Sequence, residues 1–225
     1  MKKKIIFGVV LLILAILLTL GIKNYVIIQS LEKKFEEYAN KDNYHIYNFV
    51  HQANGLKTTR DEYKKGNNSL IAYYSSDINK GLLSKVYKND AQKVNYITIY
   101  SDSKTTNIVN EDFKDETNVE IISYLKDLSF GDKLRLAVSN SLKTEKYNGK
   151  EVYRISGKSL GNEYENVIDC LVEKETGLVV YVSYESADEK DKDVEFTEMY
   201  YEFDNVDDSI FVQPDKSNFE VENNQ

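Results

Sequence analysis

An uninterrupted apolar run near the N-terminus constrains this chain more than any other feature of its sequence. Residues 5–22 read IIFGVVLLILAILLTLGI, which is eighteen residues without a charge or a proline. Since a helix rises by about 1.5 Å per residue, the run is roughly 27 Å long as a helix, close to the hydrocarbon thickness of a bilayer. The run therefore predicts one transmembrane helix at the start of the chain.

A cleaved secretory signal peptide is the alternative interpretation, because it also joins a basic start to an apolar core. Its core is usually shorter and ends at a small-x-small cleavage motif, whereas this run ends in TLGIKNY. A lipoprotein signal would require a cysteine just after the run, and the only cysteine of the chain is Cys170. We therefore expect residues 1–27 to form a short N-terminal tip and an uncleaved signal anchor.

The charges that flank the run predict its orientation. Lys2, Lys3 and Lys4 precede it, and a single Lys23 follows it closely. The positive-inside rule then places the N-terminus in the cytoplasm. We expect residues 28–225 to be one extracytoplasmic domain of a single-pass cell-membrane protein.

The composition limits the partners of this domain. The chain carries 29 Lys and Arg against 37 Asp and Glu, and three of the 29 belong to the N-terminal tip. Nucleic acid is excluded as an expected partner, because binding it requires a basic surface. A single cysteine cannot form an intramolecular disulfide, so burial and strand pairing must hold the domain together.

The period of the apolar residues predicts an α+β domain dominated by antiparallel sheet. Leu31, Phe35 and Tyr38 recur at helical spacing, so a helix continues outward from the anchor. Thr117 and Glu120 fit a capping box at the start of a second helix. Residues 131–140 alternate at Leu134, Leu136 and Val138 as a strand would, but their composition also suits a helix, which we favour. Period-two segments rich in Tyr, Ile and Val predict the strands of a meander: 44–50, 69–74, 93–100 and 194–203.

Two hairpins are predicted after residue 140. Asn148-Gly149 is a strong hairpin signal, because a type I′ turn requires positive φ at both central positions. In the second hairpin, over residues 166–185, strict alternation places six side chains on the face of Cys170: Ile168, Val172, Leu178, Val180, Val182 and Tyr184. Four of them are the candidates for a ligand cavity: Ile168, Val172, Val180 and Val182. We expect these four to line an apolar cavity, and the alternative is a face filled by the protein's own side chains.

The whole pattern resembles the periplasmic lipoprotein-carrier superfamily of the LolA, LolB and RseB type. The segments that carry the resemblance are YNGKEVYRI, VEKETGLVVYV and the closing YYEFDNVDDSIFVQPD. The resemblance implies a strongly curved antiparallel sheet, an unclosed barrel, with helices packed on the concave face around an apolar cavity. It also implies binding of lipid or acylated protein, or regulation of an envelope enzyme such as a cell-wall or spore-cortex amidase in Gram-positive bacteria.

GKSLG, residues 157–161, imitates the nucleophile elbow of a hydrolase. That motif needs a helix after the serine and then an acid and a histidine later in the chain. No histidine follows His51, and the segment after Ser159 predicts a strand. We therefore expect no catalytic residue.

The remaining candidates for chemistry are isolated. His45 and His51 lie six residues apart on one predicted strand, too far apart to share a metal ion. Cys170 lies on an apolar face, where a thiol is usually a buried hydrophobe. The acidic stretch SADEKDKDVE lacks the glycine and closing glutamate of a calcium loop. We expect no metal and no cofactor, and predict a membrane-anchored binding protein for lipid or acyl groups, with an interaction module as the alternative.

Overall fold

The chain folds into two compact units. The computed structural model describes residues 2–52, 55–75, 81–101, 104–111, 125–126, 128–139, 142–157, 167–185 and 195–222. Unit 1 comprises Met1–Ala39 with Ile121–Glu185, and unit 2 comprises Asn40–Glu120 with Ser186–Gln225. The long N-terminal helix thus belongs with the hairpins of the second half of the chain.

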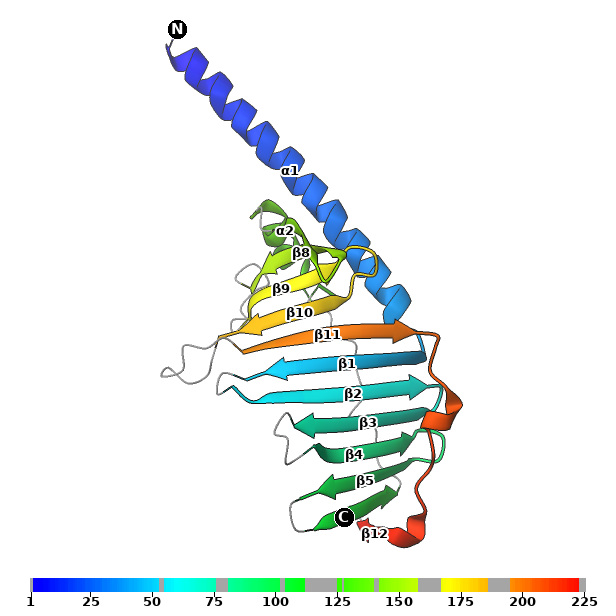
Figure 1. The fold of residues 1–225 in the computed structure, drawn as a ribbon. Helices are drawn as coiled ribbons and strands as arrows, with labels where there is room; N and C mark the ends of the chain where they lie inside the picture. The colour runs from blue at the N-terminus through cyan, green and yellow to red at the C-terminus, as the bar shows by residue number, and fades with distance from the viewer. Residues whose placement is uncertain are drawn as a thin grey trace. The chain divides into compact units, whose positions relative to one another are not determined.

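The described residues of unit 1 form two helices and four antiparallel strands (Figure 1). The helices are α1 (Lys2–Ala39) and α2 (Phe130–Val138). The strands follow one another in the order β7-β8-β9-β10, as β7 (Lys143–Tyr147), β8 (Lys150–Ser156), β9 (Val167–Glu173) and β10 (Val179–Tyr184). The predicted turn between β7 and β8 is confirmed, because Asn148 and Gly149 have φ of 49° and 81°.

Helix α1 contacts the turn that joins β9 to β10. Its buried side chains Ile28, Leu31 and Phe35 lie at helical spacing on one side, which confirms the predicted helix over residues 31–38. A Cβ atom built on Gly177 would lie 2.2 Å from the carbonyl oxygen of Leu31, and the φ of Gly177 is +73°. Lys34 Nζ also donates to the carbonyl oxygen of Lys174 at 2.6 Å. Only glycine fits where the turn meets the helix.

Where unit 2 is described, it is a meander of eight strands in the order β12-β6-β5-β4-β3-β2-β1-β11. Neighbours are antiparallel except β12 and β6, which are parallel. The strands are β1 (Asn43–His51), β2 (Lys57–Lys65), β3 (Asn68–Ser75), β4 (Leu82–Asn89), β5 (Val94–Tyr100), β6 (Thr105–Glu111), β11 (Glu195–Phe203) and β12 (Glu220–Glu222). Two short 3₁₀ helices, Asp208–Ile210 and Lys216–Asn218, precede β12.

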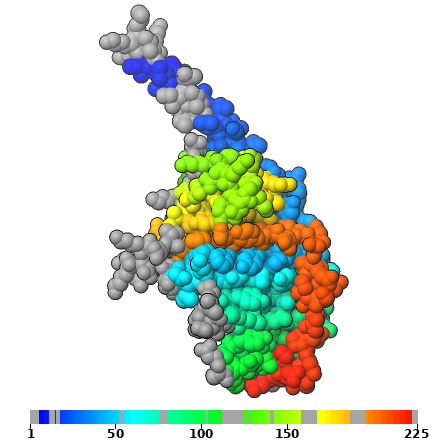
Figure 2. Space-filling model, in the orientation of Figure 1, coloured from blue at the N-terminus to red at the C-terminus, as the bar shows by residue number. Residues whose placement is uncertain are grey.

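The C-terminal segment of unit 2 completes its core. Leu70, Tyr87, Val94, Tyr96 and Val109 form a buried cluster on one face of the sheet. The side chains that cover this cluster from the C-terminal segment are Ile210, Phe211 and Phe219. Figure 2 shows this segment, in orange and red, lying along the ends of the strands of unit 2.

The fold class agrees in outline with the prediction from sequence: it is α+β, with a largely antiparallel, open sheet and few helices. The helix predicted over residues 131–140 is confirmed by α2. The helix predicted from Thr117 and Glu120 lies largely outside the described residues, although Leu125 and Leu128 are described and buried.

Helix α1 runs without a break through the apolar sequence and past residue 27. Among the residues that the structure describes, no helical segment is both long and apolar enough to cross a membrane. The side chains of residues 1–5, 12–14, 16 and 17 lie outside the described part of the chain. The anchor therefore stays a prediction.

Candidate functional site: an apolar groove in unit 1

An apolar groove of about 510 Å³ lies between α1 and α2. Five residues of α1 and three of α2 line it: Leu18, Gly21, Ile22, Tyr25, Val26, Phe130, Leu134 and Val138. The volume falls within the range of small-molecule binding sites, roughly 300–1,000 Å³.

The two walls of the groove follow from helical spacing. Leu18, Ile22 and Val26 recur every four residues along one side of α1, and Phe130, Leu134 and Val138 do the same along α2. These side chains stay accessible despite being apolar, and Phe130 is 69% exposed. Gly21 lies beside Val138 of α2, because a Cβ atom built on it would be in ordinary van der Waals contact with Val138 Cγ1 at 3.8 Å.

Polar contacts behind the groove hold α2 against α1. The side chain of Asn24 is buried, and its Nδ2 donates to the carbonyl oxygen of Ala137 at 2.8 Å. Lys133 Nζ lies 2.7 Å from Glu32 Oε1, and both side chains are largely buried. These contacts fix which face of α2 points outward.

The first turn of α2 supports the end of the groove. Ser129 is the N-cap of α2, and its Oγ accepts from the backbone N–H of Asp132 at 3.2 Å. Next to this cap, the rings of Phe130 and Tyr25 meet edge to face with their centroids 6.1 Å apart. The groove therefore has an aromatic end that is fixed by a helix cap.

The chemistry of the groove suits a hydrocarbon ligand. Its lining residues include no acid, base, thiol or amide, and the Tyr25 hydroxyl is their one polar side-chain group. Such a lining gives affinity through removal of apolar surface from water. The arrangement is suited to binding an apolar chain.

The four predicted cavity residues lie elsewhere in unit 1. Val172, Val180 and Val182 are buried in β9 and β10, and Ile168 is half-buried. A register shift between Val179 and Tyr181 places Val179, rather than Val180, opposite Val172. Strict alternation could not anticipate this bulge. The lining of the groove includes none of the four, and their role in ligand binding stays a prediction.

The other candidate residues from the sequence that the structure describes make contacts typical of a structural role. His45 Nε2 lies 3.0 Å from Asp61 Oδ1, and His51 stacks on Phe196 at 3.9 Å between ring centroids. Cys170 is fully buried, and burial raises the pKa of its thiol to about 12. Ser159 and the acidic stretch 186–194 lie outside the described residues. Among the residues that the structure describes, no acidic, histidine or cysteine side chains cluster as metal ligands would.

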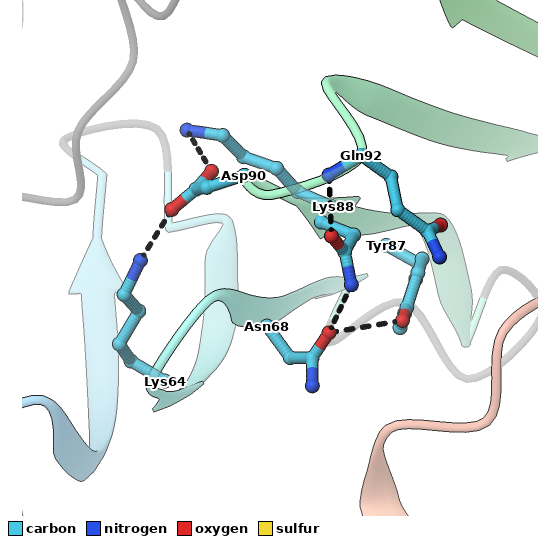
Figure 3. Close-up of polar contacts among 7 residues, drawn as sticks. Lys64, Asn68, Tyr87, Lys88, Asp90 and Gln92 are labelled. Atoms are coloured by element: carbon cyan, nitrogen blue, oxygen red, sulfur yellow. Dashed lines mark hydrogen bonds and ion pairs between the residues drawn. The ribbon is translucent and has the colours of Figure 1, made fainter.

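A polar network lies at the end of strands β2, β3 and β4 in unit 2 (Figure 3). Lys64 Nζ donates a hydrogen bond to Asp90 Oδ2 at 2.8 Å, and Lys88 Nζ lies 3.3 Å from Asp90 Oδ1. Burial alone would raise the pKa of Asp90, but the two ammonium groups hold it below its usual value. Asn68 Oδ1 accepts from both Tyr87 and Asn89. These bonds join the ends of β2, β3 and β4 to one another, so we assign the network a role in the stability of unit 2.

Glu62 is the most unusual charged group of unit 2. Its side chain in β2 is 1% exposed, and Oε2 pairs with Arg60 Nη2 at 2.7 Å. Oε1 is buried without a hydrogen-bond partner. Burial raises the pKa of Glu62 to about 7, although Arg60 and Lys64 oppose the shift. The sequence KTTRDEYKK gives no sign of this burial, because it looks like a solvated strand.

Comparison with known proteins gives no family for this chain. No family model matches it, and no curated protein sequence matches it. Among solved structures, it is similar to an uncharacterized conserved protein from Thermus thermophilus, with a TM-score of 0.49 and 8% identity. That match covers 87% of this chain and 98% of the other.

Proposed function

We propose that this protein is a membrane-anchored extracytoplasmic binding protein for lipid or acyl groups and not an enzyme. The observation that carries the proposal is the groove between α1 and α2, whose lining side chains are apolar and exposed among the described residues. An exposed apolar surface on a folded domain commonly marks a binding site. The resemblance of the sequence to lipoprotein carriers, with their curved sheet and concave-face helices, supports the same class of ligand.

The anchor in this proposal rests on the sequence of residues 5–22. The run is long enough for a bilayer, has no cleavage motif and is preceded by three lysines. The groove depends on the same helix, because Leu18, Gly21 and Ile22 belong to the run. Cleavage near Lys23 would therefore remove part of the site.

Filling the groove tests the proposal. Gly21→Phe places an aromatic ring between the helices, in the space next to Val138. We expect the wild-type full chain, purified from native membranes and examined by native mass spectrometry, to retain one lipid or fatty acid, and Gly21→Phe to lose it.

Leu20→Phe is the matched control, because it adds a ring to the same helix at an exposed residue outside the lining. We expect this variant to keep the wild-type ligand. A wild-type chain that carries no lipid, or equal loss in both variants, would contradict binding in the groove.

A second candidate function is a protein-interaction module that docks on and regulates a cell-envelope enzyme. The burial of Val172, Val180 and Val182 favours it, because side chains in a self-filled core would be as inaccessible as these are. In this case, unit 1 would have a self-filled core, and its partner would be a protein.

A further inference from the structure

Helix α2 presents an apolar face that is exposed among the described residues of unit 1. Phe130, Leu134 and Val138 lie at spacings of four residues along it, and their side chains are 69%, 47% and 49% exposed. Its polar side chains are engaged in ion pairs, with Arg135 3.3 Å from Asp132 and Lys133 2.7 Å from Glu32. This division gives a short amphipathic helix with an outward apolar face.

The C-terminal end of α2 lies next to the apolar run of α1. Val138 approaches Gly21, the second-last residue of the run, and shares the groove with Leu18 and Ile22. The apolar face of α2 is therefore continuous with the segment that we propose to be the anchor.

The last turn of α2 is prepared for an apolar environment. A helix normally leaves its last carbonyl groups without partners, which is costly away from water. Here the carbonyl oxygens of Arg135 and Leu136 accept from the backbone N–H and the hydroxyl of Ser139, each at 2.9 Å. The carbonyl oxygen of Ala137 accepts from Asn24 at 2.8 Å. The bond to Arg135 is the ordinary helical one, and the carbonyls of Leu136 and Ala137, which would otherwise need water, have side-chain donors.

We propose that the apolar face of α2 inserts into the interfacial region of the outer leaflet, beside the point where α1 leaves the membrane. This inference rests on the anchor and deepens the proposed function of the groove. A helix with Phe and Leu on one side and charges on the other binds the boundary between headgroups and acyl chains. Tyr25 and Phe130 add aromatic rings of the kind enriched at that boundary.

The position explains where the ligand of the groove comes from. With α2 in the leaflet, the groove opens toward acyl chains and fills laterally, without passage of the lipid through water. The partner of the apolar face of α2 is thus the bilayer itself. The ligand of the groove would come from the same bilayer and not from an acyl compound dissolved in water.

The single buried cysteine makes the test direct. Cys170 is fully buried, so a maleimide dye attaches selectively to a cysteine introduced on the surface. We would label Leu134→Cys and, as the matched control, Arg135→Cys on the neighbouring polar side, in the full chain in phosphatidylcholine–phosphatidylglycerol nanodiscs. Quenchers are lipids spin-labelled near the headgroup and a water-soluble iodide.

We expect the spin-labelled lipid to quench most of the fluorescence of the dye at residue 134, and iodide to quench little of it. The label at residue 135 should show the reverse. Equal iodide quenching at both positions, without lipid quenching, would overturn the insertion of α2. Circular dichroism of the two labelled proteins confirms that both keep the wild-type fold.

The outcome separates this inference from the proposed function. If iodide quenches the dyes at both residues 134 and 135 and the protein still co-purifies with a lipid, insertion of α2 is overturned and lipid binding in the groove stands. If the spin-labelled lipid quenches the dye at residue 134 and the purified protein carries no bound lipid, insertion of α2 is supported and lipid binding in the groove is overturned. A mature chain that begins near Lys23 would overturn both, because the anchor and part of the groove would be missing.

Discussion

Glu62 shows how a single residue can make the stability of unit 2 depend on pH. Its pKa is raised from 4.5 to about 7 by burial, so in the folded state it holds a proton that the unfolded chain has already lost between these values. Folding stability falls with rising pH wherever the folded state binds more protons. Its contribution is therefore greatest below about pH 4.5 and is lost as the pH rises through about 7.

We predict that Glu62→Gln removes this pH dependence. The amide is uncharged, so at pH 8 the variant should be more stable than the wild type by a few kcal/mol, an order-of-magnitude value. Arg60 keeps access to water, because its side chain is 35% exposed. Urea unfolding at pH 5 and pH 8 measures the effect.

Glu175→Gln, at an exposed residue, is the control and should keep the wild-type dependence on pH. A Glu62→Gln variant that still loses the wild-type amount of stability between pH 5 and 8 would show that other groups cause the dependence.

Gly177 carries a second prediction at the residue scale. Replacing it with alanine should destabilise unit 1, because its positive φ alone costs on the order of 1–3 kcal/mol for other residues. The new methyl group would also overlap the backbone of α1 near Leu31 and Phe35. Gly149→Ala is matched to it in φ, at +81°, with nothing within 4 Å of the built Cβ atom.

Thermal unfolding should show a larger loss for Gly177→Ala than for Gly149→Ala. Similar losses would mean that the turn moves away from the helix at little cost.

At the scale of elements, the hairpin of β9 and β10 distinguishes the two candidate functions. If the face of Val180 borders an open cavity, Val180→Phe fills it with little change in stability. If the face is a filled core, as the burial of Val180 and Val182 favours, the larger ring should destabilise the protein by about 1–3 kcal/mol. We predict the second result, with retention of lipid in the groove of α1 and α2.

Thermal unfolding and native mass spectrometry of Val180→Phe measure both quantities. A stable variant that has lost its lipid would instead return the binding site to the residues predicted from sequence.

The elements that could be predicted from sequence are those with local signals. Asn148-Gly149 defines its hairpin, and the spacing of Leu31 and Phe35 defines the buried side of α1. Strand β2 gave no such signal, because Tyr63 is its one apolar or aromatic residue. The groove was also missed, since it depends on the non-local contact of α2 with α1 through Asn24 and Ala137. A register shift between Val179 and Tyr181 interrupts the strict alternation used to assign the face of this hairpin, and the cavity residues stay a prediction.

At the scale of the whole molecule, the orientation of the chain in the membrane is the main prediction. Protease added to intact protoplasts should digest the domain, because the lysine asymmetry places residues 28–225 outside. N-terminal sequencing of the membrane fraction should find the MKKK end retained. Protection from protease until lysis would contradict the orientation, and a mature chain beginning near Lys23 would contradict the anchor.

Strand β12 has a consequence for self-association. It consists of only three residues, and it pairs in parallel with β6, where Val221 lies opposite Val109. An unpaired sheet edge is a template for strands of other molecules. The tail therefore covers the edge of β6 at Ile108–Asn110, while Phe219 just before it packs on the ring of Tyr96. Proteolytic removal of the tail from residue 219 onward would uncover both this strand edge and the Tyr96 ring, and so expose a surface that strands of other molecules can pair with.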